Sequence, residues 1–225
     1  MNWVPLMEFV RGPLFYFAIL FFIAGMAYRL VNVLALGWKK DYVPAKHNKL
    51  GGSIVAFLKG VIVWPFIPRI SQTATRNPII YFAGGLFHLG LFVTVLLGAA
   101  HILVWKSLLG FGWPSLPLPI IDWLAAIAII SLIVLFINRI SNPVLKLLTR
   151  VPDYFNLLFV FMPMVTGFFL THRLFLSYEA MFTIHVLFVD LLLIWIPLSR
   201  ISHFMFYFYS KARYGAAFAQ RGARP

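Results

Sequence analysis

Long apolar stretches constrain this chain more than any other feature, because a helix of about 20 apolar residues is what crosses a bilayer. Five such stretches occur, at residues 12–36, 79–105, 120–137, 153–170 and 180–209. The 225 residues are 62% hydrophobic and have a mean hydropathy of +0.90, whereas soluble domains are roughly half apolar. The sequence therefore predicts an all-α integral membrane protein, with five transmembrane helices that form one domain over residues 1–225.

A further apolar segment lies between the first two predicted spans, at residues 50–67. Glycines and Lys59 interrupt it, and Pro65 and Pro68 stand near its end. Such a pattern is more typical of a surface-lying or re-entrant helix than of a membrane span. We expect an amphipathic helix on the surface here.

The basic residues indicate how the five spans are oriented. The formal net charge is +13, and of the 19 lysines and arginines only Arg11, Lys106 and Arg173 fall on the side of the N-terminus. Cytoplasmic loops carry the excess of Lys and Arg, so we expect the N-terminus outside and the C-terminus in the cytoplasm, as in a multi-pass protein of the inner (cytoplasmic) membrane. Because membrane topology explains the charge, no nucleic-acid partner is expected.

Four histidines stand in two of the predicted spans. His185 and His203 are 18 residues apart in the last span, which is five helical turns, so they would share one face about 27 Å apart. The second span carries His88 and His101. The two spans run in opposite directions, so His88 would lie level with His203 near the cytoplasm. His101 would lie level with His185 near the outer face.

Paired imidazoles at matching depths favour haem. Each pair could supply both axial ligands of one b-type haem, which serves electron transfer. The chain has no cysteine, so it holds neither an iron–sulfur cluster nor a covalently attached haem. One geometric condition applies: His88 and His101 are about 140° apart around an ideal helix. Both can ligate haem only if the haems differ in tilt or the helix is distorted near Gly98.

The alternative interpretation involves no metal. Histidines inside membranes also hydrogen-bond neighbouring helices or line cavities. The chain would then be a haem-free membrane anchor or a small proton-linked transporter.

A few other residues are candidates for the site. Arg200 could pair with a haem propionate, or serve only as a cytoplasmic anchor. Lys106 could donate a hydrogen bond to a quinone carbonyl, or extend to the membrane interface. Asp190 is expected to face away from the haem stripe. Trp105 and Trp113, near span ends, are expected to be interfacial anchors.

Two runs in the sequence resemble one family. The last span carries His185, then Pro197-x-Ser199-Arg200, then His203, and the second span carries Leu-Phe-His88-Leu-Gly90. Both runs resemble the gamma subunit of respiratory nitrate reductase, a five-helix dihaem cytochrome b. That resemblance implies the four histidine ligands paired as above. It also implies electron transfer between the membrane quinone pool, near the outer haem, and a cytoplasmic iron–sulfur subunit of the same complex.

The chain departs from the nitrate reductase pattern in two places. His101 follows His88 by 13 residues instead of 10. The segment between the first two spans is longer, and is more similar to the membrane subunits of heterodisulfide-reductase-like and sulfite-reductase-linked complexes. The soluble partner in those relatives is a different iron–sulfur protein.

Overall fold

The computed structural model describes residues 2–37, 44–63 and 72–223, and no strand occurs in these ranges. Five helices are long and apolar enough to cross a membrane, which confirms the predicted fold class. They are Val4–Ala35, made of α1 (Val4–Phe9), a π-helical turn (Val10–Leu14) and α2 (Phe15–Ala35), then α6 (Pro78–Leu97), α8 (Leu118–Ser141), α10 (Val151–Thr171) and α11 (Tyr178–Leu198). The first span thus begins earlier than predicted.

The remaining helices are short or polar. They are α3 (Lys49–Leu58), which continues as a π-helical turn over Lys59–Val63, then α5 (Gln72–Arg76), α7 (Ala99–Leu109), α9 (Pro143–Leu148) and α12 (His203–Arg221). The predicted helix at 50–67 is present as α3 and its continuation, while residues 64–67 lie outside the described part of the chain.

Two predicted spans are shorter than expected. The second, predicted as 79–105, is interrupted at Gly98, whose extended backbone separates α6 from α7. The fifth, predicted as 180–209, ends at Leu198. Ser199 is extended there, and its hydroxyl accepts the Ile201 N–H at 3.2 Å, which starts a 3-10 turn, Arg200–Ser202, before α12. At both points hydrogen bonds to the backbone accompany the end of the helix, although the apolar sequence continues.

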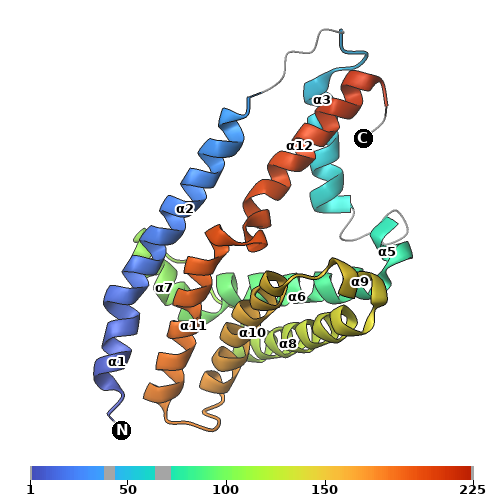
Figure 1. Cartoon of the computed structure of the whole chain (residues 1–225). Coiled ribbons are helices and arrows are strands. Elements are labelled where there is room, and N and C mark those ends of the chain that lie inside the picture. Colours follow the sequence, from blue (N-terminus) through green and yellow to red (C-terminus); the bar gives the residue numbers. More distant parts are fainter. Residues whose placement is uncertain (1, 38–43, 64–71, 224–225) are drawn as a thin grey trace.

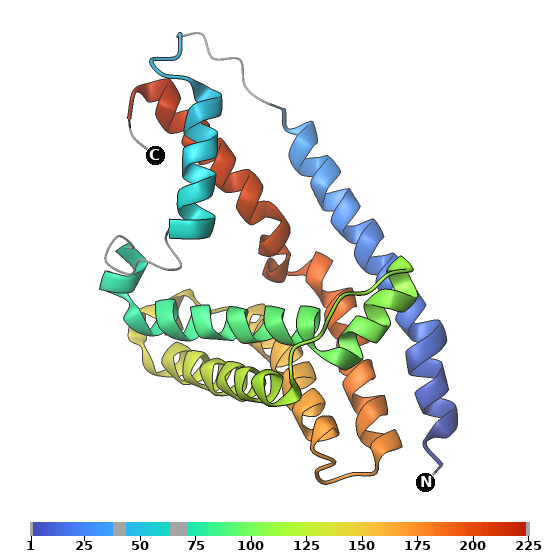
Figure 2. The same ribbon diagram turned by 180° about the vertical axis from the view of Figure 1, so that it is seen from behind.

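The spans associate as two close pairs joined by α10. Helices α2 and α11 lie side by side and run in the same direction, while α6 and α8 form an antiparallel pair that crosses them (Figure 1). The view from behind shows the same arrangement (Figure 2). Helix α10 packs against both α8 and α11. A buried apolar cluster joins α6, α8 and α10, and comprises Phe87, Ala125, Ala128, Leu132 and Met164.

Small residues let the paired helices approach closely. A Cβ atom placed on Gly25 of α2 would lie 2.6 Å from the Pro197 Cβ of α11. A Cβ on Gly90 of α6 would lie 2.8 Å from the Ala128 Cβ of α8. Between membrane helices such contacts supply the packing energy, since lipid is as apolar as the side chains.

Helices α3 and α12, far apart in sequence, also pack against each other (Figure 1). A Cβ on Gly52 would lie 2.6 Å from that of Ala219, and a Cβ on Gly215 would lie 2.6 Å from that of Ala56. Each helix therefore carries a small-xxx-small pair, which is a motif for close helix contact. The C-terminal segment is not a free tail but half of this helix pair.

The close approach at Gly90 generates a prediction. Replacing Gly90 with Ala should lower the free energy of unfolding by about 1–3 kcal/mol, because the added methyl group overpacks the contact with α8. Thermal unfolding of the purified protein in detergent measures the change. Gly84→Ala is the matched control on the same helix, since no atom lies within 4 Å of its added Cβ. Equal melting temperatures for the two variants would contradict the prediction.

Candidate functional site

The structure brings the four histidines together as two pairs. The ring centroids of His88, on α6, and His203, at the start of α12, are 6.0 Å apart. Those of His101, on α7, and His185, on α11, are 6.3 Å apart. His203 is exposed, and the other three rings are half-buried.

All four histidines use the same ring nitrogen for a protein contact. The Nδ1 atoms lie 2.7 Å from Gly84 O for His88, 3.0 Å from Thr94 O for His101, 3.2 Å from Thr166 Oγ1 for His185 and 3.0 Å from Arg200 O for His203. A carbonyl oxygen only accepts, so three of these Nδ1 atoms carry the proton. Thr166 Oγ1 already donates to Met162 O at 2.7 Å, so its oxygen accepts from His185. Each neutral ring then presents the Nε2 lone pair to another partner.

This arrangement fits an iron held between two imidazoles. Two imidazoles that hold one metal ion from opposite sides, through bonds of about 2.0–2.1 Å, have ring centroids roughly 6.3 Å apart. Metal-ligating histidines almost always donate their other N–H to an oxygen, which fixes the ring orientation. Within the described ranges no group of three or more His, Cys, Asp or Glu is placed to hold a metal ion.

The break at Gly98 sets the position of His101. It turns the chain between His88 and His101, which an unbroken helix would leave about 140° apart. A Cβ on Gly98 would lie 2.6 Å from Thr94 O and 3.2 Å from the His101 Nδ1. Only glycine therefore fits at this turn without displacing the ring.

His203 reaches its partner by a different route from the one predicted. The prediction placed His185 and His203 on one face of a single helix, and this was wrong, because α11 ends at Leu198 and His203 begins α12. Arg29 of α2 binds the break: its Nη1 donates to Ser199 O at 2.7 Å and also hydrogen-bonds the Ser202 hydroxyl. The first span thus supports the turn that carries His203.

The two other predicted site residues differ in their surroundings. Arg200 Nη1 lies 3.2 Å from Asp153 Oδ1, and the Arg200 side chain is 69% exposed. The second oxygen of Asp153 accepts the Arg150 N–H at 2.9 Å. Arg200 therefore already has a carboxylate partner. Lys106 is exposed on α7, the helix that carries His101.

A cavity of about 610 Å³ adjoins His203. It lies between α2 and the junction of α11 with α12, and its polar lining comprises Tyr28, Arg29, Asn32, Ser199, Arg200, Ser202 and His203. No acidic residue lines it among those described. The cavity is open, most of its exposed lining is apolar, and Arg29 and Arg200 are the arginines beside the histidine.

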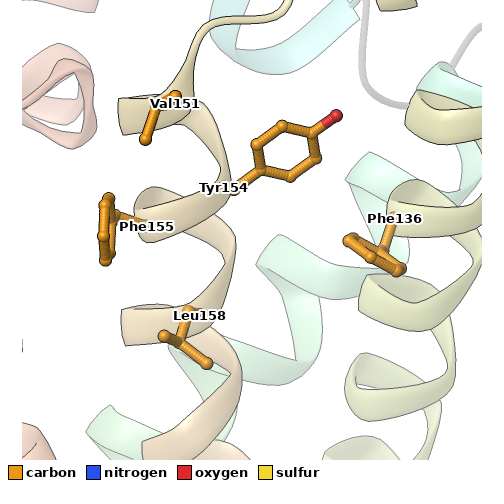
Figure 3. Close-up of a pocket in the computed structure, with 5 residues that line it drawn as sticks. All are labelled: Phe136, Val151, Tyr154, Phe155 and Leu158. Atoms are coloured by element: carbon orange, nitrogen blue, oxygen red, sulfur yellow. The ribbon is translucent and has the colours of Figure 1, made fainter.

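A second cavity of about 310 Å³ is apolar. Figure 3 shows Val151, Tyr154, Phe155 and Leu158 on α10, with Phe136 of α8 opposite them. It offers only the Tyr154 hydroxyl as a polar group, so it suits a hydrocarbon chain rather than chemistry.

Sequence reasoning missed the structural role of Arg29. Arg29 stands near the end of an apolar stretch and reads as a cytoplasmic anchor. Its hydrogen bonds to a segment 170 residues away have no signal in the sequence. Asp190 is fully buried, and neither of its oxygens has a hydrogen-bond partner among the described residues.

These elements define a class of protein: a multi-pass helical membrane protein with two histidine pairs, each formed by two different helices. The chain is 30% identical over 216 residues to a protein of Nitratidesulfovibrio vulgaris (strain Hildenborough), and the match covers 94% of this chain and 92% of that protein. This chain belongs to the same family as that protein, whose description names no activity. No family model and no solved structure matches the chain.

The Arg29 contacts generate a prediction. Arg29→Ala should lower the free energy of unfolding by about 1.5–3 kcal/mol, the range for a hydrogen bond to a charged group. Thermal unfolding in detergent measures it. Tyr28→Phe serves as the control, because Tyr28 is its neighbour on the same helix and is 70% exposed. A melting temperature for Arg29→Ala that equals that of the control would show that the contact does not stabilise the α11–α12 junction.

Proposed function

We propose that this protein is a dihaem cytochrome b subunit of a membrane-bound oxidoreductase complex. It exchanges electrons between the quinone pool and a cytoplasmic iron–sulfur subunit. The proposal rests on the two histidine pairs. All four Nδ1 atoms have a protein contact, and the ring spacing within each pair suits an iron between the two rings. The resemblance of the His88 and His185–His203 runs to the nitrate reductase gamma subunit supports the same function.

The residues have separate roles in this proposal. His88 and His203 hold the inner haem, and His101 and His185 hold the outer one. Haem, when bound, accepts and releases single electrons. Arg29 and Arg200, which line the cavity beside His203, offer guanidinium groups to carboxylates there. Both arginines also have partners within the protein: Arg200 pairs with Asp153, and Arg29 Nη1 donates to Ser199 O and hydrogen-bonds the Ser202 hydroxyl.

The quinone site is proposed near the outer histidine pair. Lys106 follows His101 by little more than one turn of α7, and its ammonium group would donate a hydrogen bond to a quinone carbonyl oxygen. With the N-terminus outside and the C-terminus in the cytoplasm of a bacterial inner membrane, protons from quinol would leave outward while electrons pass inward.

One observation favours the second candidate, a haem-free proton-linked transporter or anchor. Asp190 is fully buried without a hydrogen-bond partner in the described part of the chain, and ionisable groups inside membranes commonly mark proton pathways. The haem content of the protein separates the two candidates.

The haem proposal predicts a spectrum. The purified full-length protein, reduced with dithionite, should show a b-type alpha band and about two haems per chain. His185→Ala and His203→Ala should each lose about half of the haem, because each removes a ligand from one pair. His47→Ala and His172→Ala are the matched controls and should keep all of it, since His47 is exposed and His172 instead lies 3.6 Å from Asp122. Absence of the alpha band in the unaltered protein would reject the proposal.

The quinone proposal has its own measurement. A quinol analogue should reduce the haems, and Lys106→Ala should slow this reduction by about 5- to 30-fold, the equivalent of about 1–2 kcal/mol for one hydrogen bond. Reduction by dithionite should not change. Lys146→Ala on α9 is the control for loss of a surface charge. Equal quinol rates for the two variants would remove Lys106 from the quinone site.

A further inference from the structure

The end of α6 has a complete set of hydrogen-bond donors although it lies in an apolar segment. The last four carbonyls of a helix have no partner within the helix, and in lipid each one left unpaired costs several kcal/mol. Here each carbonyl accepts from a different group. Thr94 O accepts from Gly98 N–H at 3.1 Å and from His101 Nδ1 at 3.0 Å, Val95 O from Trp105 Nε1 at 2.9 Å, Leu96 O from Trp113 Nε1 at 2.6 Å and Leu97 O from Leu116 N–H at 3.0 Å.

The two tryptophans come from different segments and meet at this point. Trp105 lies on α7 and Trp113 lies in the chain that leads back to α8. Their rings are tilted relative to each other, with centroids 6.5 Å apart and an interplanar angle of 31°. Both indole N–H groups therefore point back at the end of α6. An interfacial anchor would instead direct its indole N–H to water or lipid headgroups.

The same turn positions His101. Gly98 has φ −72° and ψ 130°, so the chain leaves the helix there and restarts at Ala99. The His101 ring is held against the Thr94 carbonyl and faces His185. A rotation of α7 relative to α6 would break the Trp105 hydrogen bond to Val95 O and move this ring.

We infer that Trp105 and Trp113 are positioning residues for His101. By donating hydrogen bonds to the carbonyls at the end of α6, they fix the α6–α7 turn and so set the separation of the His101–His185 pair. The inference goes beyond the proposed function, which gives the two tryptophans no role. Only its haem readout rests on that function.

The first test needs no haem. The chain has no cysteine, so spin labels can be placed at Leu89→Cys on α6 and Leu108→Cys on α7, which are 52% and 40% exposed. Electron–electron distance measurement on the unaltered background should give one narrow distribution. Trp105→Phe, which keeps an apolar ring and removes the N–H, should broaden or shift it. Trp123→Phe on α8, where the indole is 72% exposed, is the matched control and should leave it unchanged.

Trp113→Phe gives a second, independent variant in case Trp105→Phe fails to insert. It removes the donor to Leu96 O without altering α7 itself. A narrow, unshifted distribution in either folded variant would overturn the inference, because the indole N–H would then have no part in fixing the turn.

The second test follows the haem. In a reductive titration of the full-length protein, Trp105→Phe should shift the potential of one haem and leave the other unchanged. Retention of that haem should weaken by about 10- to 100-fold, the usual effect of losing a group that orients a metal ligand. Unchanged potentials and unchanged retention would overturn the positioning role. If the unaltered protein holds no haem, the proposed function fails, while the spin-label experiment still decides the inference.

Discussion

A carbonyl group inside a membrane needs a hydrogen-bond donor, and this requirement shapes both places where the apolar helices are interrupted. At Gly98 the donors are two indoles, an imidazole and two backbone N–H groups. At Ser199 they are the Arg29 guanidinium and the Ser202 hydroxyl. In each case a histidine follows the break within four residues and faces a partner on another helix. Each break thus positions the histidine that follows it. The packing of the other helices keeps the two breaks in position.

Close helix contacts at small residues provide most of that packing. Gly25 against Pro197, Gly90 against Ala128, and Gly52 against Ala219 bring three helix pairs to distances that no larger side chain would allow. Close backbone approach raises the van der Waals contact between helices, which is the main attraction available where lipid competes equally for apolar surface.

Hydropathy predicted the existence of all five spans, because a bilayer imposes a length and an apolar composition that few other environments require. The proximity of His88 to His203 and of His101 to His185 could also be predicted, from the expectation that the two spans run in opposite directions. The ends of the helices could not. A serine within an apolar run, or a glycine that permits a close carbonyl, changes mean hydropathy very little, yet Ser199 and Gly98 end their helices. The carbonyls exposed by those breaks accept hydrogen bonds from Arg29, Trp105 and Trp113. The roles of these side chains could therefore not be predicted before the breaks were known. In the sequence, the pairing of α3 with α12 was indicated only by two small residues four positions apart in each helix.

The pairing of α2 with α11, and of α3 with α12, has a consequence for biosynthesis. The ribosome makes the first span and α3 early and makes α11 and α12 much later. Arg29 and its partner Ser199, for example, are 170 residues apart. The contacts of α6 with α8 are much more local and can form while synthesis continues. The first span therefore remains in the membrane without its native neighbour until α11 has been made. The contacts of α11 and α12 with the first span and α3 thus form later than those of α6 with α8.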